Sequence, residues 1–221
     1  LDKTKSKLGQ VAGQLATTEG ELAKAKAEMD TRRAVAREIK KGFAKAGVTA
    51  DVDKETGEVL LDFGDNYFAT GKADLKPQMV EYLKKVFPVY AASLMDNPNV
   101  ANKISAIEII GFASPTYKGK LVDPNTLRDH DKKAVDYNMD LSYSRARSIF
   151  QFMFDPEKMQ FKHQKDILPL IKVTGRSFLA EGSRSPAGGR GKASDVADFC
   201  SSHDCEKAQK VIIRFGLERK K

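Results

Sequence analysis

Apolar residues recur every seven positions through the first 47 residues. The repeat runs through Leu1, Leu8, Leu15, Leu22, Met29 and Ala36. The companion positions of such a repeat are only half apolar: Thr4, Val11, Thr18, Ala25, Arg32 and Ile39. The segment is rich in Ala, Lys, Glu and Gln and has no proline, which favours a helix. We expect one long helix over residues 1–47 that pairs weakly with a second copy as a parallel coiled coil, a single solvated helix being the alternative.

Glycines are expected to lower the stability of this N-terminal helix and to mark its end. Three lie inside it, at Gly9, Gly13 and Gly20, and each costs about 1 kcal/mol relative to alanine. Gly42 and Gly47 are predicted to end the helix. Residues 48–221 then form the domain.

The domain begins with two short segments whose residues are typical of β-strands. Residues 48–53 and 58–63 are predicted to pair as a hairpin. Pro77 is typical of the first turn of a helix, which is predicted to run to about Met95. Pro88 is expected to kink or interrupt it.

Residues 107–153 carry the candidate chemistry. Ile107 to Gly111 alternate as a strand does, and Gly111 permits a sharp exit into a ligand-facing loop. Ser142 is predicted to be the N-cap of the following helix. Arg145 then lies in the first turn, where the helix dipole disfavours a cation, so an anion should offset it. The alternative interpretation is a solvated surface arginine.

The remaining elements complete the predicted layout. A short helical segment is expected near residues 156–165, a strand at 171–175 and the last strand at 210–216. Between them, residues 181–205 are rich in Gly, Ser and Arg and are predicted to be an inserted exposed loop. Strands that alternate with helices at these spacings predict an α/β (α+β) fold with helices packed on one mixed sheet.

The net charge and the surroundings of the histidines reduce the number of function classes that the sequence supports. The net charge of +8 and the pI near 9.3 favour a polyanionic partner, but no nucleic-acid-binding motif accompanies them, so nucleic acid is not the predicted partner. His130, His163 and His203 neighbour no convincing nucleophile or paired carboxylate. We expect a protein that is not an enzyme and uses no cofactor or metal.

Four motifs in chain order resemble the family of OmpA-like peptidoglycan-binding domains. The pattern N-x-x-L-S-x-x-R-A is read at Asn138, Leu141, Ser142, Arg145 and Ala146. Residues 68–86 resemble the F-x-x-G-x-x-x-L-x-P segment, residues 111–114 the G-[HY]-[TA]-D turn, and residues 173–177 the V-x-G-x-[GS] motif. The resemblance covers about residues 55–216. It implies a βαβαβ sandwich and non-catalytic binding of peptidoglycan.

The resemblance also implies a site. Arg145 occupies the position of the arginine that holds the diaminopimelate carboxylate of the stem peptide, and Asn138, Leu141 and Phe112 belong to the same pocket. Ser114 replaces the aspartate that meets the ammonium group of the ligand. A charge-assisted contact of about 1.5–3 kcal/mol then becomes an ordinary hydrogen bond. The acids expected to compensate are Asp129, Asp131, Asp136 and Asp140.

Within this family, the coiled coil and the long excursion from Thr116 to Asp136 are more similar to MotB-type stator subunits, including the B subunit of the Zorya antiphage motor, than to Pal. This implies a periplasmic homodimer that anchors a membrane motor, with a MotA-like partner, to the cell wall. Because the chain begins at Leu1 without methionine, we expect a membrane anchor upstream.

Two alternatives remain open for the function. The chain is either a Pal-type outer-membrane lipoprotein, or an OmpA-like domain that has lost peptidoglycan binding and serves dimerisation or protein interaction. The second alternative stays open because Ser114 is neutral where the family has an aspartate.

Cys200 and Cys205 are the only cysteines and lie at the end of the insertion. In an extracytoplasmic compartment we expect them to form a disulfide, which would contribute about 2 kcal/mol by closing a small ring. A metal site with His203 and Asp204, or two free thiols, are the alternatives.

Overall fold

The computed structural model describes residues 2–61, 68–69, 71–122, 128–178 and 210–217. The helices are α1 (Asp2–Lys45), α2 (Pro77–Met95), α3 (Pro98–Ala101), α4 (Asp129–Met153) and α5 (Gln164–Ile167), followed by the 3₁₀ turn η2 (Leu168–Leu170). The strands are β1 (Asp51–Val52), β2 (Val59–Leu61), β3 (Ile104–Gly111), β4 (Thr116–Tyr117), β5 (Lys120–Leu121), β6 (Ile171–Gly175) and β7 (Val211–Leu217). None of the described helices combines the length and apolarity of a membrane span.

The described strands form one mixed sheet in the order β1-β2-β7-β3-β6, and β4 and β5 form a separate hairpin. Strand β3 is antiparallel to β7 and parallel to β6, so that Ile109 lies beside Ile213 on one side and Val173 on the other. The predicted N-terminal hairpin is confirmed, with Val52 paired to Val59. The mixed sheet with packed helices is the predicted fold class.

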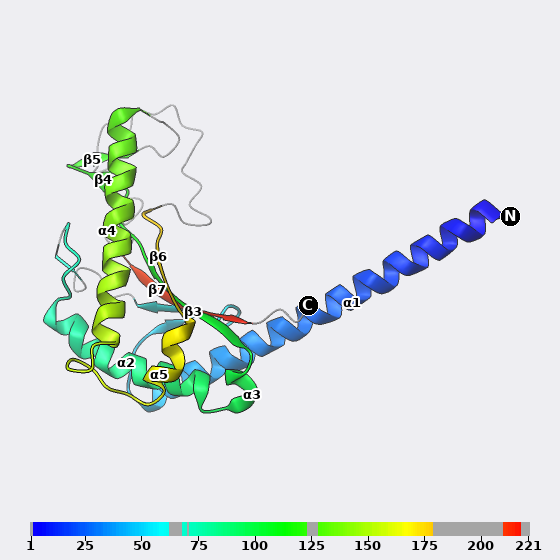
Figure 1. The fold of residues 1–221 in the computed structure, drawn as a ribbon, viewed down its shortest axis with the longest axis horizontal. Helices are drawn as coiled ribbons and strands as arrows, with labels where there is room; N and C mark the ends of the chain where they lie inside the picture. Colours follow the sequence, from blue (N-terminus) through cyan, green and yellow to red (C-terminus); the bar gives the residue numbers. More distant parts are fainter. Residues whose placement is uncertain (1, 62–67, 70, 123–127, 179–209, 218–221) are drawn as a thin grey trace.

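Helices α2 and α4 cover the core. Helix α2 buries the predicted stripe of Met79, Leu83, Val86, Phe87 and Tyr90. It runs through Pro88 as one helix, so the expected interruption does not occur. Helix α4 crosses β3 and β6, as Figure 1 shows. The side chains of Ile107, Ile109 and Ile213 fill the interior beneath them.

Helix α1 has two parts with different surroundings. Its N-terminal part projects away from the sheet as a long arm, which is visible in Figure 1. Its C-terminal part joins the core, where Val35, Ile39 and Phe43 are at most 2% exposed. Arg32 supports this docking, because its Nη1 donates to the carbonyl of Phe215 at 3.4 Å. The division at residue 47 stays a prediction, although the core already includes α1 from Val35.

Gly42 does not end α1, contrary to expectation. A Cβ at this position would lie 2.8 Å from Ser93 Oγ on α2, so the missing side chain lets the two helices approach closely. The helix ends at Lys45, and Gly47 follows with a φ of 65°, a conformation that favours glycine.

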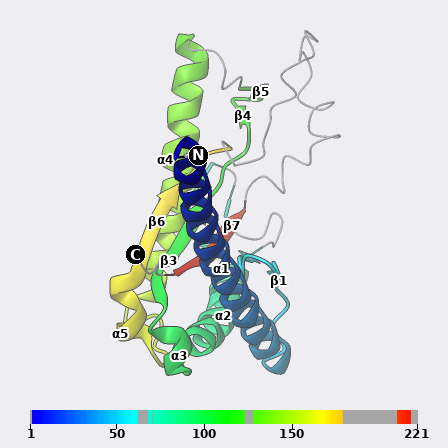
Figure 2. The same ribbon diagram turned by 90° about the vertical axis from the view of Figure 1, so that its right-hand side faces the viewer.

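The polar excursion after β3 contains a tight hairpin. Lys118 and Gly119 connect β4 to β5, and both have positive φ, at 48° and 72°. Two consecutive positive φ angles define a type I′ turn, whose twist matches that of paired strands. The hairpin lies beside the N-terminal half of α4 (Figures 1 and 2).

Candidate functional site

Helix α4 begins earlier than the sequence predicts. It starts at Asp129 and is 25 residues long, so Ser142 is an interior residue and not the N-cap. The Ser142 hydroxyl donates to the carbonyl of Met139 at 2.8 Å, which is the way a serine is accommodated inside a helix. Asp129 and Asp131 occupy the first turn, where acidic residues are favoured. Arg145 therefore lies far from the helix N-terminus, and the expected dipole effect does not apply to it.

Two glycines bring α4 onto the sheet. A Cβ on Gly111 would clash with the Ser142 carbonyl oxygen, and a Cβ on Gly175 would lie 2.6 Å from the Tyr143 nitrogen. Gly111 is absent from the residues with positive φ, so it is needed for close packing and not for a sharp exit. The backbone N–H of Ser177 donates to Ser142 Oγ at 2.9 Å. Ser142 thus joins the ends of β3 and β6 to the helix.

The arginine motif occupies one buried face of α4. Asn138, Ser142 and Arg145 follow at spacings of four and three residues, and each is at most 2% exposed. Asn138 Nδ2 donates to the carbonyl of Thr116 at 3.3 Å, which ties the β4 strand to the helix. Leu141 is half-buried.

The Arg145 side chain is enclosed. Its Nε donates to the carbonyl of Lys72 at 3.1 Å, and its guanidinium lies 5.1 Å from the ring centroid of Phe68. Nη1 is buried and has no hydrogen-bond partner among the described residues. Burial lowers the pKa of Arg145 to about 10, so the group is still charged at neutral pH. The alternative interpretation of Arg145 as a solvated surface arginine is therefore wrong.

The turn after β3 contributes the other predicted residues. Ser114 Oγ lies 2.8 Å from Thr116 Oγ1, and Ser114 is half-buried. Phe112 is 5% exposed, and its backbone N–H donates to the carbonyl of Lys210 at 3.0 Å. The Lys210 ammonium lies 5.5 Å from the Phe112 ring centroid. The contact that Asn138 makes with Thr116 brings this turn to the same face of α4 as Arg145.

No acid of α4 takes the place of the family aspartate. Asp129, Asp136 and Asp140 are exposed and lie on the opposite side of the helix from Arg145 at 100° per residue. Asp131 shares the face of Arg145, but fourteen residues separate them, which is about 21 Å along the axis. None of the four can meet an ammonium group held next to a carboxylate at Arg145. The expected compensation is therefore not supported.

Sequence reasoning missed the residues that enclose the arginine. Phe68 and Lys72 lie in the first family motif, but no spacing rule links that segment to Arg145, which is 73 residues after Lys72. Thr116 and Ser177 act mainly through main-chain groups, which the sequence does not distinguish.

The other candidate groups lie elsewhere. His163 bridges Asp96 and Asp166, and His130 lies beside Asp131. No group of His, Cys, Asp and Glu in the described part of the chain is arranged to hold a metal. Cys200, Cys205, His203 and the insertion 181–205 lie outside the described residues.

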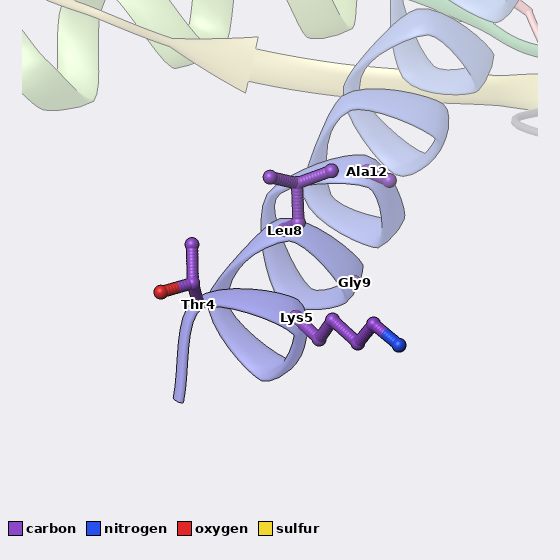
Figure 3. Close-up of a pocket in the computed structure, with 5 residues that line it drawn as sticks. All are labelled: Thr4, Lys5, Leu8, Gly9 and Ala12. Carbon is purple, nitrogen blue, oxygen red and sulfur yellow. The ribbon is translucent and has the colours of Figure 1, made fainter. Parts of the chain in front are cut away.

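A shallow hollow lies on the projecting arm of α1 (Figure 3). It is lined by Thr4, Lys5, Leu8, Gly9 and Ala12. Because all five residues belong to three turns of one helix, they form an open apolar surface and cannot enclose a ligand.

One known protein is similar in sequence to more than half of this chain. The sequence is 31% identical over 128 residues, 58% of this chain, to the Zorya protein ZorB of Escherichia coli. The match spans about half, 49%, of the length of that relative. No protein-family model matches the chain. The fold class and this relative support a domain of the OmpA/MotB type.

Three solved structures are also similar to this chain. A MotB-like protein from Desulfovibrio vulgaris is 15% identical with a TM-score of 0.46, and the match covers 87% of this chain and 94% of that one. The OmpA-like domain of FopA1 from Francisella tularensis is 18% identical, with a TM-score of 0.35 and coverages of 77% and 82%. The periplasmic domain of Helicobacter pylori MotB is 12% identical, with a TM-score of 0.36 and coverages of 77% and 87%.

Proposed function

We propose that this chain is a non-catalytic cell-wall-binding domain that holds a carboxylate of the peptidoglycan stem peptide at Arg145. The observation that carries the proposal is the enclosed charge. Arg145 is 2% exposed, and its Nη1 has no acceptor among the described residues. A buried cation without an anionic partner is costly, and a carboxylate is the group that a guanidinium binds best.

The way in for such a ligand follows from the contacts of Arg145. Its guanidinium is covered by the Phe68 ring and bound by the Lys72 carbonyl. We infer that a carboxylate reaches Nη1 when the residues around Lys72 move aside. Ser114 offers the ligand's ammonium group a hydroxyl and no charge, so the carboxylate contact supplies most of the affinity.

The wider role rests on the relative named ZorB and on the resemblance to MotB-type subunits. The domain works in the periplasm and anchors a membrane complex of the stator type, with a MotA-like membrane partner, to the cell wall. Helix α1 is the stalk through which two copies pair and which leads towards a membrane anchor. No catalytic step or cofactor belongs to this role.

The test is co-sedimentation with purified peptidoglycan sacculi, comparing the wild type with Arg145→Met. Methionine fills a buried site without a charge, and its introduction removes the desolvation cost of a buried cation that has no anionic partner. We expect Arg145→Met to fold with a stability within about 1 kcal/mol of the wild type. Its sacculus binding should fall at least about tenfold, since a charge-assisted contact is lost.

Arg147→Met is the matched control, because Arg147 lies on the same helix but is exposed. It should bind sacculi as the wild type does. Equal binding by Arg145→Met and the wild type would refute the carboxylate site. If the wild type itself does not bind, the neutral Ser114 marks a domain that has turned to a protein partner.

A further inference from the structure

A cluster of aromatic and basic side chains lies next to the Arg145 site, where the β4–β5 hairpin meets α4. We call Tyr117, Lys118, His130 and Tyr137 the aromatic platform. The Tyr117 ring centroid lies 5.1 Å from that of Tyr137 and 6.2 Å from that of His130. The Lys118 ammonium lies 5.4 Å from the Tyr117 ring centroid. Three rings from two elements thus gather around Tyr117.

The platform is open to solvent and held in place. Tyr137 is 42% exposed and the His130 side chain 54% exposed. The type I′ turn fixes the position of Tyr117, and it places the non-glycine Lys118 at a φ of 48°. Such a conformation costs a non-glycine residue about 1–2 kcal/mol, and the type I′ turn requires it at this position. A preorganised, exposed aromatic surface is suited to bind a ligand.

The platform adjoins the Arg145 site through two contacts. A Cβ on Gly71 would lie 3.3 Å from the Tyr137 hydroxyl, and the next residue, Lys72, accepts the hydrogen bond from Arg145. Asn138 joins β4 to α4 between the two places. Along α4, Tyr137 and Arg145 are eight residues apart, which is about 12 Å. Three to four extended residues of a peptide span this distance.

We propose that the aromatic platform is a saccharide subsite, in which the Tyr137 ring stacks on a sugar ring of the glycan strand. This inference rests on the proposed function, because a stem peptide held at Arg145 would place the sugar that carries it within reach of the platform. The C–H face of a pyranose is apolar and fits the face of a tyrosine ring. His130 and Lys118 supply donors for the sugar's hydroxyl and carbonyl oxygens.

The charges around the platform favour a neutral ligand over a polyphosphate. Basic and acidic residues are mixed at this end of α4, with the N-cap Arg128 and with Lys132 and Lys133 near Asp129, Asp131 and Asp136. A strand of phosphates needs a surface of one sign. A sugar chain does not.

The test incubates the full chain with glycan strands from which an amidase has removed the stem peptides. The amidase leaves a carboxylate on each sugar that carried a peptide, so binding is measured at about 0.5 M salt, where exposed charges are screened. We expect the wild type to bind them and Tyr137→Ala to bind about tenfold more weakly, the loss that a stacking contact of about 1.4 kcal/mol corresponds to. Tyr137→Phe keeps the ring and should bind as the wild type does. Tyr143→Ala is the matched control, since Tyr143 is 46% exposed on the same helix outside the platform.

The variants separate this inference from the proposed function. The Arg145→Met variant should bind intact sacculi more weakly than the wild type does, but it should bind peptide-free glycan equally well. The saccharide subsite is overturned if the wild type does not bind peptide-free glycan, or if Tyr137→Ala binds it as strongly as the wild type does. Either outcome leaves the test of the carboxylate site at Arg145 unaffected. Binding of a single-stranded oligonucleotide that Tyr137→Ala abolishes, without glycan binding, would also overturn it.

Discussion

At the residue scale, the distance between α4 and the sheet depends on two glycines, which have no side chain. Gly111 and Gly175 leave room for the backbone of α4 at Ser142 and Tyr143. This contact sets the height of Asn138 and Arg145 above the ends of β3 and β6. The site is therefore sensitive to any group added at either glycine.

We predict that Gly111→Ala destabilises the protein by about 1–3 kcal/mol, because its Cβ would clash with a main-chain oxygen that cannot rotate away. Urea unfolding followed by circular dichroism measures the loss. Gly13→Ala is the control, since no atom lies within 4 Å of a Cβ there, and it should be neutral or stabilise α1 by up to about 1 kcal/mol. Equal midpoints for Gly111→Ala and the wild type would contradict the close contact.

At the element scale, His163 connects the end of α2 to the start of α5. Its Nε2 lies 2.7 Å from Asp96 Oδ1, and its Nδ1 lies 2.7 Å from Asp166 Oδ2. The hydrogen bonds with Asp166 and then Asp96 raise the pKa of His163, although the nearby Lys162 opposes the shift. A raised pKa means that the charged histidine stabilises the fold. This contribution is complete below the unfolded pKa of about 6.5 and is lost as the pH rises through the folded pKa.

We predict that His163→Asn destabilises the protein more at pH 6 than at pH 9. Asparagine tolerates the φ of 66° at this position but does not titrate. Urea midpoints of both proteins across this range give the difference in stability. A difference that is the same at both pH values would show that the ion pairs of His163 do not contribute.

At the scale of the whole molecule, the apolar stripe of α1 is divided between two uses. Ala36 and Ile39 belong to the buried core, whereas Leu8, Leu15 and Leu22 are 58–71% exposed. An exposed leucine seam on a projecting helix is the surface that a parallel coiled coil buries. Dimerisation through this seam remains a proposal, and it can be tested without disturbing the core.

We predict that Leu15→Lys combined with Leu22→Lys raises the dimer dissociation constant at least about tenfold, since two lysines would enter the seam. Analytical ultracentrifugation over a concentration series gives the constant. The control combines Ala16→Lys with Ala23→Lys, which adds the same charge one residue away from each leucine. A wild-type chain that is monomeric at every concentration would rule out the seam as a dimer interface.

The sequence by itself determined most of the elements. Period-two and helical patterns predicted the N-terminal hairpin, α2, β3, β6 and β7, because these patterns follow from the local geometry of strands and helices. The ordered motifs indicated the OmpA/MotB type of domain and placed Asn138 and Arg145 in one site. The first half of α4, residues 129–141, was not predicted, because its buried positions, Ala134 and Asn138, are small or polar and give little apolar periodicity.

Only the tertiary structure decided how the site is built. Ser142 lies inside a helix, Gly111 is a packing glycine, and Arg145 is enclosed by Phe68 and Lys72. The last two of these facts depend on contacts between segments 30 or more residues apart. The periodicity of apolar residues predicts which face of a helix or strand is buried. It does not predict which segment, distant in the sequence, packs against that face.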